Sequence, residues 1–553
     1  PSCLCGFSSA HPRSSCWWLA SLLLRVICTS SSSPSSSSSF SSPSFPMYQR
    51  RGVGGSRAGS LGTPLVLLDV NTRSPTRVLS ENFLSLQLDP SIISDGWLVF
   101  LSSKRLVTLA RGLSPAFLRF GGKRTDFLQF NNQKNLAKYR GPGPDYYLKN
   151  YDDVIFSCQH ICMHKDCKTR HTTNVDLQLL CGFLPARSLD KLYNFADCAG
   201  LHLILGLNAL HRNPDNSWNT SSTLTLLKYS AGKKYNISWE LGNEPNAYRS
   251  MVGRAINSTQ LAQDYTQLRT LLQSVRYYNR AHLYGPNAGR PRRNAILLLD
   301  GFMKDAGSVI DAVTWQHYFQ DGGVKKVEDF LKTRLLDALR EQMTKVAKVV
   351  STHAPGKKVW LGGLGPAWSG GINNLSDTFA AAFLSVIFLT NVVILYYFFL
   401  NCDYWFSLVF KRLVGPRVLA VQVATVQRKP RTGRVIRGKL RIYAHCTSYS
   451  NHNYMRGSIT IYIINLHRSR KKIKLAVTLR NNTVHQYLLQ PYGNDGLRAK
   501  HVQLNGERLS MLDNETFPEL KPKTLRAGRT IAMPPMTIGF YVLKNINAYA
   551  CRR

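Results

Sequence analysis

A glutamate that follows an apolar run is the residue of this chain best placed to do chemistry. The segment 239–245 reads Trp-Glu-Leu-Gly-Asn-Glu-Pro and comes directly after the strand-like run 235–238. An Asn-Glu-Pro set at a strand end is typical of the acid/base carboxylic acid of retaining glycosidases, which need a second carboxylate about 5 Å away as nucleophile. The region where that partner is expected, 360–364, reads Trp-Leu-Gly-Gly-Leu and contains no Asp or Glu.

Glu244 is the candidate acid of this segment. A carboxyl group that donates a proton to a glycosidic oxygen needs a pKa raised toward neutrality by burial or by a neighbouring negative charge. A strand end inside a cleft meets that need, and Asn243 beside it can bind a sugar hydroxyl. The alternative interpretation is a surface glutamate in a turn. Glu240, four positions earlier, is expected to be structural.

A strand–helix alternation that begins at residue 65 must position these groups. Helical patterns, such as 259–277 and 327–349, lie between seven apolar runs that predict strands: 83–88, 116–120, 201–208, 235–241, 283–287, 309–318 and 358–362. Short buried strands alternating with amphipathic helices predict a parallel sheet with crossovers. Seven or eight such repeats predict an α/β fold, a (β/α)8 TIM barrel over 81–414, whose active site lies at the C-terminal strand ends.

The uncharged run from Phe379 to Leu400 has two interpretations. It is long enough to span a bilayer, which would give a membrane-associated protein. The alternative, which we favour, is a buried barrel helix over 378–384 followed by an eighth strand over 392–399. Basic chain and glycosylation sequons continue beyond this run, and its β-branched and aromatic residues suit a buried strand.

The two ends of the chain differ from the barrel. From residue 415 onward, short alternating runs predict a C-terminal β-sandwich over 415–553, with strands at 418–424, 439–446, 458–466, 474–479 and 537–543. A strand at Leu65–Val70, within the segment 65–80, is expected to pair into this sandwich. Residues 1–64 are Ser-rich and predict a disordered segment, in which 17–24 resembles the apolar core of a signal peptide.

Charge and sequons point to a secreted protein with a polyanionic partner. Lys and Arg number 71 against 31 Asp and Glu, a net charge of +40, which predicts nucleic acid, an acidic membrane surface or a sulfated polysaccharide as partner. Standard nucleic-acid-binding motifs are absent from the sequence, so no nucleic acid is expected. Six sequons favour a secretory glycoprotein: Asn219, Asn236, Asn257, Asn374, Asn481 and Asn514.

The chain resembles the heparanase family, glycoside hydrolase family 79. The resemblance covers about 65–553 with gaps and is carried by the runs 83–89, 109–126, 238–245 and 375–377, and in the tail by 440–446, 464–467 and 502–506. The stretches 430–437 and 468–474 look closer to a paralogue regarded as catalytically inactive. The family implies a TIM barrel with a β-sandwich, no cofactor, and cleavage of heparan sulfate by a retaining mechanism.

The resemblance assigns roles to individual residues. The family's acid/base maps onto Glu244 and its nucleophile, in the pattern Trp-Leu-Gly-Glu, maps onto Gly363. Glycine cannot form a glycosyl-enzyme intermediate, so the sequence predicts an inactive enzyme. The other residues that the resemblance places at the barrel mouth as substrate-binding are Asp89, Asn243, His317, Tyr318, Gly370 and Gly371. For His317, as for Trp315, ordinary packing within the barrel is the alternative interpretation.

Three basic segments are expected to bind heparan sulfate or heparin. The first, 290–293, follows the fifth strand and contains Arg292 and Arg293. The second, 428–441, carries seven Lys and Arg in fourteen residues, and the third, 467–474, carries five in eight. Because Arg and Lys bind sulfate and carboxylate groups, the second and third predict a heparan-sulfate patch of Arg428, Lys429, Arg431, Arg468, Arg470, Lys471, Lys472 and Lys474. A solvated charged face is the alternative interpretation.

Twelve cysteines suit a secreted protein with a few disulfides. Cys446 and Cys551, at the two ends of the β-rich tail, are a predicted pair. The irregular segment 156–185 stands where the family has an excised linker. Cys158, Cys162 and Cys167 of this segment are possible partners of Cys198, and we favour Cys167. The Cys and His residues of the segment also invite a zinc interpretation, but no second pair at zinc-site spacing follows, so no metal is expected.

Three functions compete at this point. The first is a secreted, inactive protein of the extracellular matrix or cell surface that binds heparan sulfate proteoglycans, with the family's active enzyme as a further candidate partner. The second is an active endo-β-glucuronidase that cleaves heparan sulfate with an unusual nucleophile. The third is a membrane-anchored matrix receptor.

Overall fold

A computed structural model describes residues 65–94, 97–132, 182–318, 324–365, 372–388, 402–425 and 438–552. Within these ranges, seven parallel strands form one sheet in the order β11-β10-β9-β8-β7-β4-β3. In chain order they are β3 (Leu86–Leu88), β4 (Ala116–Phe120), β7 (Leu201–Leu207), β8 (Ile237–Leu241), β9 (Leu283–Ala288), β10 (Ala312–Tyr318) and β11 (Lys358–Gly365). All seven predicted strands therefore exist and form the parallel sheet of a TIM barrel.

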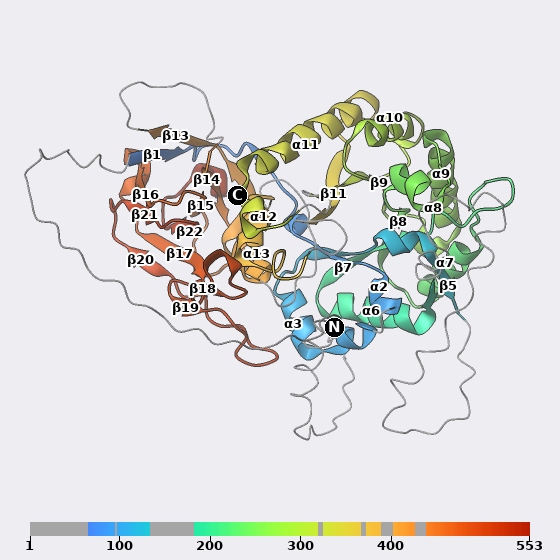
Figure 1. Cartoon of the computed structure of the whole chain (residues 1–553), viewed down its shortest axis with the longest axis horizontal. Coiled ribbons are helices and arrows are strands. Elements are labelled where there is room, and N and C mark those ends of the chain that lie inside the picture. Colours follow the sequence, from blue (N-terminus) through green and yellow to red (C-terminus); the bar gives the residue numbers. More distant parts are fainter. Residues whose placement is uncertain are drawn as a thin grey trace, which may run out of the picture. The chain divides into compact units, whose positions relative to one another are not determined.

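Helices connect the barrel strands (Figure 1). The longer ones are α3 (Lys104–Arg111), α6 (Ala186–Cys198), α7 (Ser221–Gly232), α9 (Ser258–Ser274), α10 (Arg293–Ala306), α11 (Thr333–His353), α12 (Phe379–Phe388) and α13 (Cys402–Leu413). Short helices α2 (Ser91–Ser94) and α8 (Tyr248–Val252) and the two-stranded sheet of β5 (Leu128–Asn131) and β6 (Gly182–Pro185) lie in the loops.

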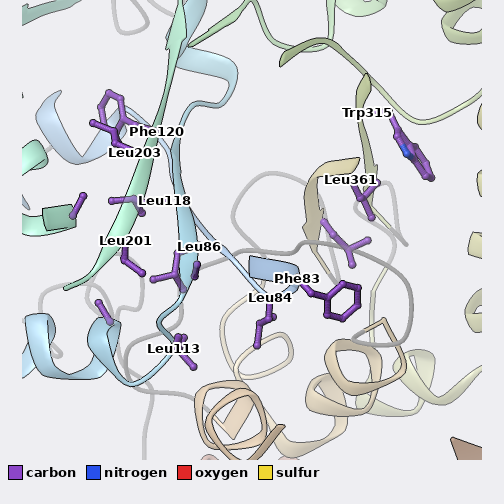
Figure 2. Close-up of a cluster of buried hydrophobic side chains, with 14 of the residues drawn as sticks. Phe83, Leu84, Leu86, Leu113, Leu118, Phe120, Leu201, Leu203, Trp315 and Leu361 are labelled. Carbon is purple, nitrogen blue, oxygen red and sulfur yellow. The ribbon is translucent and has the colours of Figure 1, made fainter. Parts of the chain in front are cut away.

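The barrel strands alternate between an apolar outer face and a mixed inner face. Leu86, Leu118 and Leu203 are register neighbours on β3, β4 and β7 and belong to the large apolar core (Figure 2). The residues between them in sequence, such as Gln87 and Arg119, point to the other face, because successive strand residues alternate. The barrel interior therefore carries the polar groups.

Several predicted boundaries were wrong. The first predicted barrel strand begins at Leu86, because residues 81–83 form a 3₁₀ turn whose start is capped by the Ser80 hydroxyl. The helix predicted over 327–349 is a 3₁₀ turn, Val327–Leu331, followed by α11 after extended backbone at Lys332. The helix predicted over 259–277 ends at Ser274.

The apolar run after residue 378 contains a helix, as we favoured. Helix α12 begins at Phe379 and its first six residues are buried. The strand predicted over 392–399 lies outside the described residues. Across the described part of the chain, every helix is too short or too polar to cross a membrane.

The C-terminal strands form two sheets. A nine-stranded sheet contains β2 (Arg77–Val78), β12 (Val414–Leu419), β14 (Leu440–Thr447), β15 (Ile459–Asn465), β17 (Val484–Pro491), β18 (Val502–Leu504), β19 (Glu507–Arg508), β20 (Lys523–Leu525) and β22 (Thr537–Leu543). A four-stranded sheet has the order β13-β1-β16-β21, with β13 (Val421–Thr425), β1 (Leu65–Val70), β16 (Lys471–Leu475) and β21 (Ile531–Met533). Ile461 of one sheet and Ile473 of the other share a buried core, as in a sandwich.

Two predicted sandwich strands were wrong in detail. The strand predicted over 418–424 is two strands, because the chain passes from the larger sheet to the smaller one at Ala420. The strand predicted over 474–479 is β16, which begins three residues earlier and ends four residues earlier than predicted. Helix α14 (Val477–Arg480) follows it. The predicted pairing of Leu65–Val70 into the sandwich is confirmed, since β1 pairs with both β13 and β16.

Candidate functional site: the mouth of the barrel and a basic sheet

Glu244 lies on a tightly held loop at the C-terminal end of β8. Its backbone N–H donates to the Asn287 carbonyl oxygen at 3.0 Å, and its φ of 50° is in the left-handed region. Non-glycine residues adopt that conformation rarely, and mostly where the surroundings enforce it. Position 242, with φ of 78°, requires glycine, because a Cβ atom there would lie 2.5 Å from the Tyr248 hydroxyl oxygen. The backbone of the loop is therefore held in a single conformation at Gly242 and Glu244.

A buried carboxylate anchors this loop from below. Asp126 accepts hydrogen bonds from the Asn243 backbone N–H at 3.0 Å, from the Tyr248 hydroxyl at 2.8 Å and from the Ala209 N–H at 3.2 Å. Burial raises the pKa of Asp126 to about 7, although these hydrogen bonds act in the opposite direction. Both Asp126 oxygens thus hold the loop in place, a role that sequence reasoning did not predict.

Asn243 is the centre of a buried amide network. Its side-chain oxygen accepts from Gln316 Nε2 at 2.6 Å, Asn287 Nδ2 at 3.0 Å and Arg119 Nη2 at 3.2 Å. Three donors on one oxygen exceed the two lone pairs of an amide carbonyl. The network holds Asn243 in place beside Glu244.

Glu240 is part of the barrel interior, as expected. It accepts from Arg119 Nε at 2.6 Å and from the Thr314 hydroxyl at 2.8 Å, and it is 1% exposed. Because both carboxylate oxygens are bonded within the barrel, Glu240 is not available to attack a sugar. A cavity of about 20 Å³ lies among Arg119, Glu240, Thr314 and Gly362, which is room for about one water molecule.

Gly363 lies on β11, opposite Gln316 of β10. A Cβ atom built at Gly363 would lie 3.0 Å from Gln87 Oε1 and 3.2 Å from Gln316 Oε1. Two glutamine side chains therefore border the position where the family's nucleophile would begin. Gln87 donates to the Gly121 carbonyl oxygen at 2.9 Å, while its own Oε1 is buried without a hydrogen-bond partner among the described residues. Sequence reasoning did not single out Gln87 or Gln316.

The other predicted mouth residues lie on neighbouring strand ends. Asp89 follows β3, and burial raises the pKa of its carboxyl. His317 and Tyr318 end β10; burial, together with the Arg290 charge, lowers the pKa of His317 to about 3, and the Tyr318 hydroxyl donates to Gln316 Oε1 at 3.2 Å. Gly370 and Gly371 lie outside the described residues.

The first basic segment follows a loop that approaches Glu244. Arg292 and Arg293 are exposed at the start of α10. They follow Gly289, where a Cβ atom would lie 3.0 Å from Glu244 Oε1. The loop from β9 to α10, which leads to both arginines, therefore passes close to Glu244.

The third basic segment forms the outer face of β16. Along the strand, exposed Lys472 and Lys474 alternate with Ile473 and Leu475, which are buried in the sandwich. The residues opposite the two lysines are Leu65 and Leu67 on β1, and Ala532 on β21 lies opposite Lys472. Arg468 and Arg470 are exposed just before the strand, and Lys471 is half-buried. Neither Lys472 nor Lys474 forms an ion pair with a described residue, so both charges are available to a ligand.

The described residues that flank the second basic segment lie near the third. Arg428, Lys429 and Arg431 lie outside the described residues, but the strands on either side are described. Strand β13 ends with Thr425 level with Val66, which is also level with Ile473 of β16. On the other side of the segment, the Lys439 carbonyl oxygen accepts a hydrogen bond from the Leu466 backbone N–H at 2.6 Å. The fold thus brings both attachment points of segment 426–437 to the neighbourhood of β16.

The sandwich carries much of the chain's charge. Residues 415–553 contain 25 Lys and Arg against five acids, and those five all lie between Asp495 and Glu519. The β16 sheet and the turns around it are therefore a cationic surface, which attracts polyanions.

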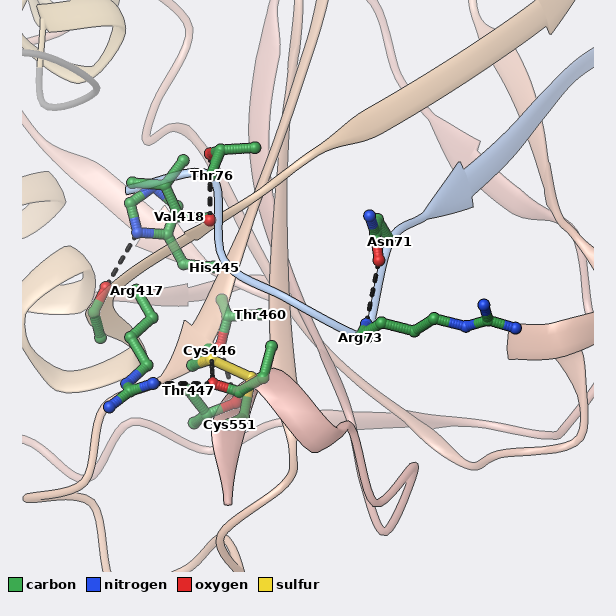
Figure 3. Close-up of a disulfide and its surroundings, with 12 residues drawn as sticks. Asn71, Arg73, Thr76, Arg417, Val418, His445, Cys446, Thr447, Thr460 and Cys551 are labelled. Carbon is green, nitrogen blue, oxygen red and sulfur yellow. Dashed lines mark hydrogen bonds between the residues drawn. A yellow bond between two sulfur atoms is a disulfide. The ribbon is translucent and has the colours of Figure 1, made fainter. Parts of the chain in front are cut away.

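The predicted Cys446–Cys551 disulfide is confirmed (Figure 3), with 5.3 Å between the Cα atoms. Cys198 is also disulfide-bonded, while its predicted partner Cys167 lies outside the described residues. Of the sequons, Asn236, Asn257, Asn374, Asn481 and Asn514 are exposed and Asn219 is half-buried. No cluster of three potential metal ligands occurs within the described ranges.

Comparison with known proteins gives close relatives. The model of the glycosyl hydrolase family 79 N-terminal domain matches residues 149–389. The chain is 60% identical to mouse inactive heparanase-2 over 99% of both chains, and 40% identical to mouse heparanase over 90% of this chain and 96% of that protein. Among solved structures, a 4-O-α-L-rhamnosyl-β-D-glucuronidase from Fusarium oxysporum matches with a TM-score of 0.56 at 13% identity, covering 86% of this chain and 100% of that one, which shows the shared fold.

Proposed function

The chain belongs to glycoside hydrolase family 79, and from this membership we propose that it binds heparan sulfate without cleaving it. The observation that carries the proposal is the environment of Gly363. No carboxylate side chain can start from that residue, and Gln87 and Gln316 border the space in front of it. A retaining mechanism requires a covalent intermediate on a second carboxylate, so Glu244 alone gives an acid without a nucleophile.

The nearby carboxylates do not replace the missing one. Glu240 is committed to Arg119 and Thr314, and Asp126 is committed to the Glu244 loop. Loss of the covalent step is expected to cost several orders of magnitude in rate, since each ~1.4 kcal/mol of lost transition-state stabilisation is tenfold. The name of the mouse relative, inactive heparanase-2, agrees with this proposal.

Binding in this proposal uses two surfaces. At the barrel mouth, Asp89, Arg292 and Arg293 contact the sugar chain, while the buried Asn243, His317 and Tyr318 form the strand ends beside them. The basic face of the sandwich contacts the sulfate groups of the chain. The six sequons support secretion to the extracellular matrix or cell surface. There the protein would occupy heparan sulfate proteoglycans and so limit access by active heparanase.

Sizing heparan sulfate chains after incubation with the purified protein tests the catalytic part. We expect unchanged chain length for the wild type and for Glu244→Gln. Shortened chains with the wild type that remain intact with Glu244→Gln would overturn the proposal in favour of an active endo-β-glucuronidase.

Elution from immobilised heparin tests the binding part. We expect the wild type to need high salt, because binding a polyanion releases its counterions, and Lys472→Ala/Lys474→Ala to elute earlier. The matched control is Lys345→Ala/Lys348→Ala on the exposed face of α11, which removes the same charge from the barrel. Equal shifts for both pairs would mean that only net charge matters and that β16 is not a site.

A further inference from the structure

A second cluster of arginines lies beyond the C-terminal end of β16. Strand β21 runs antiparallel to β16, with Ile473 opposite Ile531. Because the two strands are antiparallel, the residues just before β21, including Arg529, lie toward the end of β16 that Leu475 forms. Arg526 and Arg529 are exposed on the turn before β21, and the Arg529 N–H donates to the Arg526 carbonyl oxygen at 3.2 Å.

Arg480 joins this cluster from helix α14. The Gly528 N–H donates to the Arg480 carbonyl oxygen at 2.6 Å, which brings the end of α14 against the turn 526–529. The Arg480 side chain is exposed, and none of Arg480, Arg526 and Arg529 forms an ion pair with a described residue. The nearest acid in the contacts of α14 is Asp69, which accepts from the Thr478 hydroxyl at 3.0 Å.

A sequon lies inside this second cluster. Asn481 directly follows Arg480, is exposed, and begins the sequence Asn481-Asn482-Thr483. The Thr483 carbonyl oxygen accepts from the Lys544 N–H at 3.2 Å, so a further basic residue borders the loop on its other side. The other sandwich sequon, Asn514, stands between Asp513 and Glu515, in the acidic part of the sandwich.

We propose that an N-linked glycan on Asn481 covers the arginine cluster Arg480, Arg526 and Arg529 and thereby shortens the polyanion-binding face that begins at β16. This inference rests on the proposed heparan sulfate binding and adds that glycosylation regulates the extent of the binding surface. A glycan is bulky and hydrophilic, and its attachment next to Arg480 places it over side chains that would otherwise meet the next sulfates of the chain. Glycosylated protein would then bind through β16 alone, and unglycosylated protein through both parts.

The test uses full-length protein secreted from glycosylating cells and immobilised heparin. We expect Asn481→Gln to elute at higher salt than the wild type, and Asn514→Gln, the matched control, to elute with the wild type. The dependence of the logarithm of affinity on the logarithm of salt concentration should steepen by on the order of one for each arginine uncovered. In the Asn481→Gln background, replacing Arg480, Arg526 and Arg529 by Ala should return elution to the wild-type position or below.

The outcomes separate this inference from the proposed function. Wild-type retention that depends on Lys472 and Lys474, with no change in Asn481→Gln, would reject the glycan inference alone. A peptide mass spectrum with unmodified Asn481 would also reject it. Weak retention of every form, glycosylated or not, would reject heparan sulfate binding itself. Asn481→Gln leaves the folded core intact because Asn481 is exposed, so its retention time reports on binding.

Discussion

Gln87 Oε1 lies 3.0 Å from the position that a Cβ atom would take at Gly363. The two residues come from β3 and β11, the first and last described strands of the barrel sheet. A carboxylate at position 363 would therefore meet a side chain that is itself held by the Gly121 carbonyl oxygen. The space in front of residue 363 thus restricts which side chain this position can hold.

Gly363→Glu is accordingly expected to destabilise the fold without giving a hydrolase. Overpacking of this kind typically costs about 1–3 kcal/mol. Adding Gln87→Ala should recover part of the loss, which a double-mutant cycle on unfolding free energies measures. Gln87→Ala alone is the control. Simple additivity of the two changes, or cleavage of heparan sulfate by Gly363→Glu alone, would contradict the steric argument.

The buried Arg119–Glu240 pair should matter far more than an exposed pair. Both side chains are nearly inaccessible, at 6% and 1% exposure, and removing one partner leaves a buried charge uncompensated, which costs about 3–5 kcal/mol. We expect Glu240→Gln to lower the free energy of unfolding by that order. Glu515→Gln, which breaks the exposed Lys104–Glu515 pair, should change it by less than about 1 kcal/mol. Comparable losses in the two variants, by chemical denaturation, would show that the buried pair contributes no more than a surface one.

The strands of the barrel could be predicted because each carries its own local signal. A run such as 116–120 is apolar over the length of a strand except at Arg119, and the fold follows from repeating that unit. Strand β16 was placed three residues too late because its signal is mixed: Lys472 and Lys474 alternate with buried Ile473 and Leu475. A basic run suggests a solvated loop unless the buried alternate residues are given weight.

The candidate site could be predicted only in part. Short motifs single out Glu244 and Gly363, whereas Gln87 and Gln316 border Gly363 because strands separated in sequence meet in the sheet. Arg119 and Glu240 are separated by 121 residues, and nothing local to either one indicates the other. Arg119, inside the otherwise apolar strand Ala116–Phe120, was the one indication of a buried ion pair. A charge in a buried strand requires a partner of opposite charge.

The pH dependence of stability should report on Asp126. Burial raises its pKa from 3.8 to about 7, so the folded protein keeps a proton that the unfolded chain releases. The stabilisation from this proton is complete below about pH 3.8 and is lost as pH rises through about 7. Asp126→Asn cannot ionise, so its stability should fall less than that of the wild type between about pH 5 and pH 8.

Thermal or denaturant unfolding of the two proteins across that range measures this difference. Burial lowers the pKa of His317 to about 3 and of His445 to about 4, and these histidines reduce stability as pH falls below about 6.5. Their effect is common to both proteins and cancels in the comparison. A constant difference in unfolding free energy at all pH values would mean that Asp126 is ionised throughout.

The Cys446–Cys551 disulfide should stabilise the sandwich, because it joins residues 105 positions apart. Closing a loop of this length restricts the unfolded chain, and removing a native disulfide typically costs about 2–5 kcal/mol. We expect Cys446→Ser/Cys551→Ser to unfold at a lower denaturant concentration than the wild type. Reductant should not lower the stability of the sandwich in this variant any further. Both sulfurs are buried, so Cys446→Ala/Cys551→Ala separates the lost bond from the burial of a hydroxyl. If the alanine pair matched the wild type under oxidising conditions, packing rather than the covalent link would hold β14 to the C-terminal turn.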